Sequence, residues 1–205
     1  MPLPRAIRQR LEAQLVQLAA LATARDLSGD RLQWGVLGVA AVVGALLLVV
    51  PMLLPGGHGV LLLLPAALAA RAVALAVADL REREHPDGPA RDPAVRAVTD
   101  AGAELFLYLP LATYPGVAPA PVVLLVALGL LAEIAGLAAP GRGGSRRHDG
   151  PMTQQDRAIV FALAGVILAL DPRAAPWLPW LLVPAATLAV ATVYSRMQGR
   201  ATADE

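Results

Sequence analysis

The chain has 205 residues, of which 57% are hydrophobic and 16% are charged, whereas an average soluble domain has about 25% charged residues. The formal net charge is only +1 and cysteine is absent, which excludes disulfide-rich modules, thiolate metal sites and binding of nucleic acid through a basic surface. The composition predicts an all-α, polytopic membrane protein.

Residues 1–31 are predicted to form a cytoplasmic amphipathic helix. Apolar residues recur there at spacings of four, four, three and three, which places them in one stripe: Ile7, Leu11, Leu15, Leu18 and Leu21. Such a helix lies along the membrane interface. The alternative is a soluble helix that packs on the cytoplasmic face of the protein.

Six apolar stretches follow, and together they predict a domain of six transmembrane helices over residues 32–195. A helix needs about 20 residues to cross the hydrocarbon core. The stretches are Leu32–Leu54, Val60–Ala78, Val98–Thr113, Ala120–Ala139, Ala158–Leu170 and Ala174–Tyr194. The fifth is short, so five or seven spans are the alternative counts. Residues 196–205 are predicted to form a cytoplasmic tail.

The distribution of arginine predicts the orientation in the membrane. All 17 basic residues are arginine, and 15 of them lie before the first stretch, after the sixth, or in the second and fourth connections. Arginine is concentrated on the cytoplasmic side of bacterial membranes. We therefore expect a multi-pass protein of the bacterial cytoplasmic membrane with both termini in the cytoplasm.

Four carboxylates border the second and third stretches. Asp79 and Glu82 are three residues apart, and Asp100 and Glu104 are four apart, so each pair shares a helix face. Two antiparallel helices would bring the pairs to a similar depth, where a cation must lie between them. Oxygen ligands favour magnesium, manganese or calcium. The alternative for Asp79 and Glu82 is that they are solvated charges at a helix end.

Three segments resemble the CDP-alcohol phosphatidyltransferases, in particular a bacterial branch with a GPxGKSDRA-type loop. The segments are Asp100–Pro110 (DAGAELFLYLP), Leu131–Leu137 (LAEIAGL) and Asp149–Leu170 (DGPMTQQDRAIVFALAGVILAL). The resemblance covers about residues 60–195. It implies a six-helix, usually dimeric membrane enzyme that transfers a phosphatidyl group from a CDP-linked lipid to an alcohol and releases CMP.

The signature motif of that family, D-x2-D-G-x2-A-R followed by G-x3-D-x3-D, is degenerate here and permits two alignments. In the first, Asp79, Glu82, Asp100 and Glu104 reproduce the acid offsets of 0, 3, 21 and 25, but no other motif position is retained.

The second alignment is anchored on Arg71, on Arg83-Glu84-His85 and on the LYLP segment at Leu107–Pro110. It places apolar residues at the first acid pair and Arg96 at the third acid, so that Asp100 is the remaining signature aspartate and Glu104 an additional downstream acid. We favour this alignment slightly because it matches three local anchors.

If the chain is active, the resemblance implies Glu104 as the catalytic base, Asp100, Asp79 and Glu82 as ligands of Mg²⁺ or Mn²⁺, and Arg83 and Arg157 as substrate-binding residues. The expected partners are a CDP-linked lipid, a polar alcohol, membrane lipids, and a second copy or a paralogue in a dimer.

Two alternatives of other classes remain open at this point. The first is a catalytically degenerate family member that acts as a partner subunit or lipid-binding scaffold. The second is a small transporter that uses Glu133 and Arg71 in an ion path. Glu133 lies within the fourth stretch, and we expect it to form a structural ion pair with Arg71 or Arg157.

Overall fold

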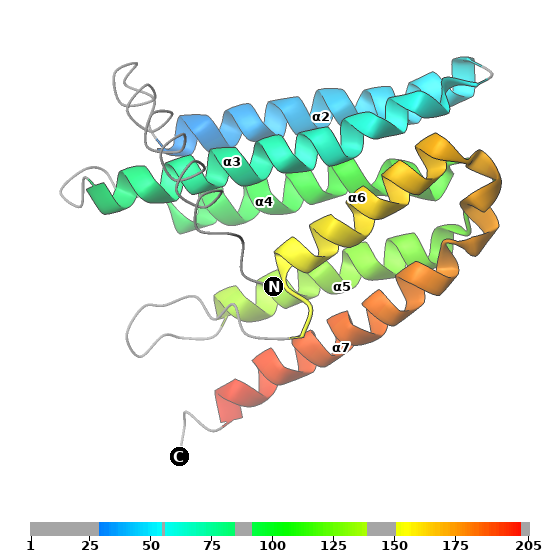
Figure 1. The fold of residues 1–205 in the computed structure, drawn as a ribbon. Coiled ribbons are helices and arrows are strands. Elements are labelled where there is room, and N and C mark those ends of the chain that lie inside the picture. Colours follow the sequence, from blue (N-terminus) through cyan, green and yellow to red (C-terminus); the bar gives the residue numbers. More distant parts are fainter. Residues whose placement is uncertain (1–28, 55, 85–91, 139–150, 202–205) are drawn as a thin grey trace, which may run out of the picture.

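The computed structural model describes residues 29–54, 56–84, 92–138 and 151–201, which form six α-helices and three 3-10 turns. With the labels of Figure 1, these are α2 (Gly29–Leu53), η1 (Gly57–Leu62), α3 (Leu63–Glu84), α4 (Pro93–Tyr108), η2 (Leu109–Thr113), α5 (Pro119–Ala138), α6 (Gln154–Leu170), η3 (Pro172–Trp177) and α7 (Pro179–Ala201). The described part contains no strand, which confirms the all-α class there. The amphipathic segment predicted before α2 falls on residues 1–28, outside the described residues.

Three segments are long and apolar enough to cross a membrane: Gly29–Leu53, Gly57–Arg83 and Pro179–Met197. A shorter apolar helix covers Pro119–Ala135. The helices α4 and α6 have 16 and 17 residues, or roughly 24 and 26 Å at 1.5 Å per residue, slightly less than a hydrocarbon core of about 30 Å. The membrane character is therefore supported, while the count of six spans stays a prediction.

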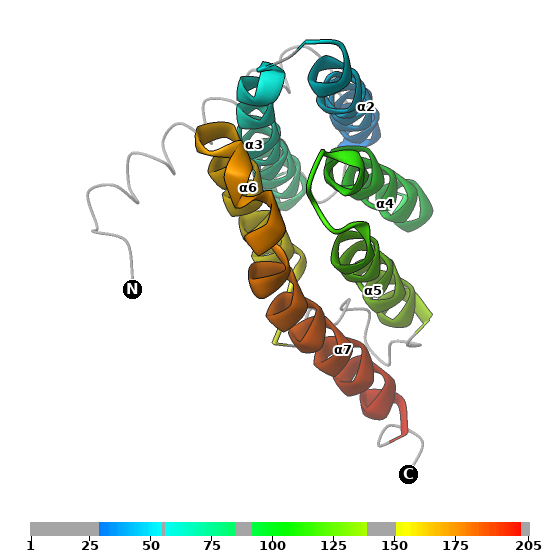
Figure 2. The ribbon, with the colours of Figure 1, turned by 90° about the vertical axis from the view of Figure 1, so that its right-hand side faces the viewer.

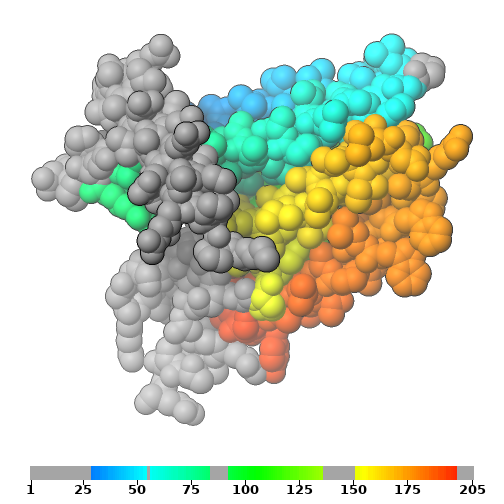
Figure 3. All heavy atoms as spheres, viewed as in Figure 1, coloured from blue at the N-terminus to red at the C-terminus, as the bar shows by residue number. Residues whose placement is uncertain are grey.

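The six helices run alternately up and down in one bundle. The turns η1, η2 and η3 lie together at one end, and the start of α2 and the end of α7 lie at the other (Figure 1). Seen along the helices, α3, α6 and α7 form one row and α2, α4 and α5 a second (Figure 2). In the space-filling view α3, α6 and α7 make a continuous face (Figure 3).

The apolar core extends along the bundle from the three turns to Met152, which directly precedes α6. Its fully buried side chains include Leu64, Leu107, Leu125, Phe161 and Leu182, each no more than 1% exposed. The buried charged side chains extend from the middle of the bundle, with Arg71 on α3 and Glu104 on α4, to the start of α6 and the last turns of α7, with Arg157 and Arg196. Because these charged groups are buried away from water, other side chains of the protein must provide their counter-charges.

Helix α4 begins and ends where its sequence contains a capping residue and a proline. The Asp92 side chain accepts a hydrogen bond of 2.8 Å from the Ala94 N–H, and Pro93 occupies the first helical position. At the other end, Pro110 has no N–H for the carbonyl of Phe106 four residues earlier. The α-helix therefore ends at Tyr108 and continues as the tighter η2 turn.

A capping box starts α6. Asp156 accepts hydrogen bonds from the Thr153 backbone N–H at 2.8 Å and from the Thr153 hydroxyl at 2.7 Å, and the Asp156 N–H donates back to that hydroxyl oxygen at 3.3 Å. The hydrogen bonds from Thr153 hold the pKa of Asp156 below its ordinary value of 3.8. The cap fixes the start of α6 at Gln154 and so places Arg157 in its first turn.

We expect Thr153→Ala to lower the free energy of unfolding by about 1 kcal/mol at neutral pH, because an N-cap hydrogen bond is lost. Because folding lowers the pKa of Asp156, the cap stabilises fully above the ordinary aspartate pKa and loses this contribution as the pH falls through the folded value. Thermal unfolding in detergent at a series of pH values measures both effects. Thr187→Ala, at an exposed position within α7, is the matched control, and an equal loss in the two variants would contradict the capping role.

Candidate functional site

Buried charged side chains from four helices, α3, α4, α6 and α7, meet inside the bundle. Arg71 on α3 is 6% exposed, Asp100 and Glu104 on α4 are 6% and 1% exposed, and Arg157 on α6 and Arg196 on α7 are 1% and 6% exposed. An ionised group buried without a counter-charge costs several kcal/mol, on the order of the whole stability of a protein. Each of these groups therefore needs an opposite charge close by.

The first group of ion pairs connects α3 and α4. Arg71 Nη2 lies 3.0 Å from Asp100 Oδ1 and also donates to the Asp100 carbonyl at 3.3 Å. Arg96 lies between two acids, with Nη1 3.9 Å from Asp79 Oδ1 and Nε 3.9 Å from Asp100 Oδ2. The Arg71 contact is short and buried, whereas the Arg96 contacts are longer and partly solvated. Asp100 is thus held by two guanidinium groups.

The second group connects α4, α5, α6 and α7. Arg157 Nη2 lies 3.0 Å from Glu104 Oε1 and 3.2 Å from Glu104 Oε2. The same nitrogen is 3.7 Å from Glu133 Oε1, and Arg196 Nη1 approaches that oxygen to 3.8 Å. Arg196 also donates to the Ala132 carbonyl at 2.6 Å. The result is a chain of alternating charges: Glu104, Arg157, Glu133 and Arg196.

Arg157 fits into the bundle because Gly129 on α5 leaves room for it. A Cβ at position 129 would lie 2.7 Å from Arg157 Nε and 3.0 Å from Cζ. Beside this pair Tyr108 stacks on Phe161, with ring centroids 4.0 Å apart and planes inclined by 9°. The guanidinium is nevertheless incompletely satisfied, since its Nε and Nη1 atoms are buried and make no hydrogen bond.

The predicted metal ligands are not brought together around one point. Asp100 and Glu104 share a face of α4 as expected, but Asp100 faces Arg71 and Glu104 faces Arg157. Asp79 is partly exposed and borders Arg96, while Glu82 lies exposed near the end of α3. Among the described residues, no group of three or more histidine, aspartate or glutamate side chains is placed to hold a metal ion. Within the part of the chain that the structure describes, the predicted ligands therefore do not form one site for a divalent metal.

The two arginines predicted to bind substrate lie in different surroundings. Arg157 is 1% exposed and holds Glu104, so its guanidinium is occupied inside the protein. Arg83 is exposed in the last turn of α3. The expected ion pair of Glu133 is confirmed with Arg157, at 3.7 Å, whereas Arg71 pairs with Asp100.

The sequence interpretation did not identify Arg71, Arg96 and Arg196 as counter-ions of these acids. A partial signal was present for Arg96, which precedes Asp100 by four residues and so shares its helix face. Arg196 was assigned to the cytoplasmic tail, but α7 continues to Ala201 and turns this side chain inward. Nothing in the local sequence indicated that Arg71 would meet Asp100.

A comparison with curated proteins finds a similar membrane protein. The chain is 29% identical over 142 residues to "Inner membrane protein YnbA" of Escherichia coli (strain K12), and the match covers 69% of each of the two chains. No family model matches the chain, and no solved structure matches it.

Proposed function

We propose that this chain is a six-span protein of the bacterial inner membrane that resembles the CDP-alcohol phosphatidyltransferases. In this proposal it does not catalyse phosphatidyl transfer. It acts instead as a lipid-binding scaffold or as the partner subunit of an active paralogue. One observation carries the proposal. The carboxylates that would hold a metal, Asp100 and Glu104, are paired with the buried guanidinium groups of Arg71 and Arg157.

Charge balance supports a site that works without metal. Four carboxylates that approach one another require cations between them. The ion pairs of the bundle connect Asp79, Asp100, Glu104 and Glu133 with Arg71, Arg96, Arg157 and Arg196. Among the described residues, four positive charges thus lie beside four negative ones. A divalent ion would add two positive charges to this network, and to reach Asp100 or Glu104 it would first have to displace Arg71 or Arg157, which are almost fully buried.

The proposed location rests on the helices and on the relative. The described part has three helices able to cross a membrane, and the similar protein of E. coli is by its name an inner membrane protein. The remaining three helices complete a bundle of six, whose arginine-rich ends are assigned to the cytoplasm. This orientation places the ion pairs in the cytoplasmic half of the membrane, and both termini inside.

Catalysis is the second candidate function, and one geometric observation favours it. Asp79 on α3 and Asp100 on α4 contact the same guanidinium, that of Arg96. The two acids therefore lie at one level of the bundle, as the acid-spacing alignment of the signature motif requires.

Release of CMP from CDP-diacylglycerol distinguishes the two functions. We expect the purified protein to release no CMP above background with Mg²⁺ or Mn²⁺ and a panel of acceptors including glycerol 3-phosphate, inositol phosphate and serine. An active family enzyme runs in parallel as the positive control. Metal-dependent release that is lost in both Asp100→Asn and Asp79→Asn would overturn the proposal and establish the acid-spacing alignment.

A further inference from the structure

The end of the bundle that holds η1, η2 and η3, here called the turn end, exposes large apolar side chains. Residues 52–54 at the end of α2 are exposed, and Trp177 in η3 and Trp180 in the first turn of α7 are 68% and 77% exposed. The two sites lie at opposite edges of the bundle, because α2 and α7 occupy the two ends of its cross-section (Figure 2). A single protein partner on one edge would leave the other edge in water, whereas a lipid bilayer surrounds both.

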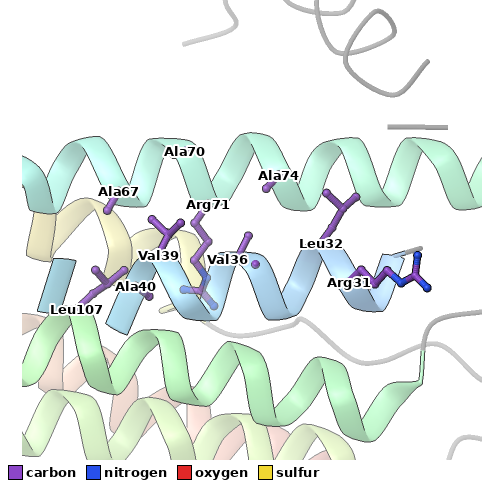
Figure 4. A pocket seen from close by; sticks show the side chains of 11 residues that line it. Arg31, Leu32, Val36, Val39, Ala40, Ala67, Ala70, Arg71, Ala74 and Leu107 are labelled. Carbon is purple, nitrogen blue, oxygen red and sulfur yellow. The ribbon is translucent and has the colours of Figure 1, made fainter. Parts of the chain in front are cut away.

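The turn end also carries very little charge. Segments 50–66, 105–121 and 167–182 include the three turns, and they contain one carboxylate and one guanidinium side chain, Asp171 and Arg173. Asp171 caps η3, since its side chain accepts a hydrogen bond of 3.0 Å from the Arg173 N–H. Toward the opposite end, Arg71 reaches inward between α2 and α3 and Arg31 lies at the start of α2 (Figure 4). The turn end is therefore suited to lipid, and the arginine-rich end to water.

Helix lengths place the tryptophans near the boundaries of the hydrocarbon core. The apolar segment Pro179–Met197 of α7 is about 28 Å long at 1.5 Å per residue, close to a hydrocarbon thickness of about 30 Å. Trp180 lies in the first turn of that segment, and Trp177 directly precedes it. The third tryptophan of the chain, Trp34, is exposed near the other end of α2, about 28 Å from Leu53 along the helix. Tryptophan is enriched at both membrane interfaces, because its ring is apolar while its N–H can meet water or headgroups.

We propose that the turn end is a membrane-interface surface, seated among the headgroups and glycerol groups of the outer leaflet, with Trp177 and Trp180 as its anchors. The inference rests on the inner-membrane orientation proposed above and adds which surface meets the outer leaflet. A turn end seated in this way leaves little surface for a periplasmic partner. A partner subunit is therefore expected to contact the lipid-facing sides of the bundle or its arginine-rich end.

Fluorescence quenching in phosphatidylcholine vesicles tests the proposal with the full chain, which has three tryptophans. Trp34→Phe combined with Trp180→Phe leaves Trp177 as the single emitter, and Trp34→Phe combined with Trp177→Phe leaves Trp180. A nitroxide on the lipid headgroup lies at the interface, whereas a nitroxide near the end of the acyl chain lies at the bilayer centre. We expect the headgroup nitroxide to quench each emitter about twofold more strongly than the deep nitroxide, as for a ring held at the interface.

Val42→Trp, in a chain whose three native tryptophans are replaced by phenylalanine, is the matched control. Val42 is 63% exposed near the middle of α2, so this emitter should be quenched most strongly by the deep nitroxide. If neither nitroxide quenches it, the membrane placement itself is wrong, and the proposed function and this inference fail together.

Two outcomes would overturn this inference alone. Equal or stronger quenching of Trp177 and Trp180 by the deep nitroxide would place the turn end inside the hydrocarbon. Efficient quenching by aqueous iodide, with none by either nitroxide, would place it in water, where a soluble protein could bind it. In both cases the Val42→Trp control still reports a deep position, and the CMP assay is unaffected. Failure of the anchors is therefore distinguishable from failure of the proposed function.

Discussion

Replacing Arg157 by methionine is expected to lower the free energy of unfolding by about 3–5 kcal/mol, the usual cost of removing one partner of a buried ion pair. The substitution leaves the Glu104 carboxylate, which is 1% exposed, without the guanidinium that lies 3.0 Å from it. Arg196 still neutralises Glu133. The loss therefore arises mainly from Glu104, which is left buried without its counter-ion.

A double-mutant cycle measures this coupling. Unfolding in mixed micelles, followed as denaturing detergent is added, gives the stability of Arg157→Met, Glu104→Gln and the double variant. We expect the double variant to be more stable than Arg157→Met alone, since the neutral amide needs no counter-ion. Arg173→Met, at an exposed arginine of η3, is the control and should change stability little. Strictly additive losses in the cycle would contradict a direct pair between Glu104 and Arg157.

The helices themselves were predictable from sequence, because hydrophobic length is a local property. Each of the six apolar stretches became a helix, with α3 continuing past Ala78 to Glu84 and α7 past Tyr194 to Ala201. Both extensions follow from polar, charged residues that are good helix formers but lower the local hydropathy. The α-helix of the third stretch ended earlier than expected, at Tyr108, because Pro110 removes a backbone donor.

The ion pairs could be predicted only in part, because they depend on how each helix is rotated toward its neighbours. The need for a cation among the acids followed from their spacing, but the identity of that cation did not. A metal ion and a guanidinium satisfy the same charge requirement. The structure contains Arg71 and Arg96 beside Asp100, and Arg71 comes from a position 29 residues away on another helix. Tertiary packing, not local pattern, decides such a pair.

Small residues determine which helices approach closely, and their role also appears only in the packed structure. Gly129 leaves the space that Arg157 occupies, whereas a Cβ added at Gly35 would meet no atom within 4 Å. In sequence both are single glycines within apolar stretches. A glycine that contacts a neighbouring helix and a glycine that faces lipid are therefore indistinguishable until the helices are assembled.

Gly44→Ala is expected to be strongly destabilising, because α2 and α4 touch at this residue through their backbones. A Cβ at position 44 would overlap the carbonyl oxygen of Phe106 and lie 2.9 Å from its carbonyl carbon. That carbonyl lacks its usual α-helical donor, since the residue four positions later is Pro110. Close approach of a glycine Cα to such a carbonyl permits a weak Cα–H···O contact, as is common where membrane helices pack.

The added methyl group must push the two helices apart, since the obstructing atoms are backbone and cannot rotate away. We expect a loss of about 2–3 kcal/mol, the upper part of the range for overpacked sites. Gly38→Ala on the same helix has free space around the new Cβ and should gain up to about 1 kcal/mol from improved helix propensity. Unfolding of the two variants in the same micelles measures the difference. Equal stability of the two variants would mean that α2 and α4 do not pack through Gly44. Pro110→Ala offers an independent test, because alanine restores an N–H that can donate to the Phe106 carbonyl. That hydrogen bond should weaken the contact between Gly44 and Phe106 only if the contact exists.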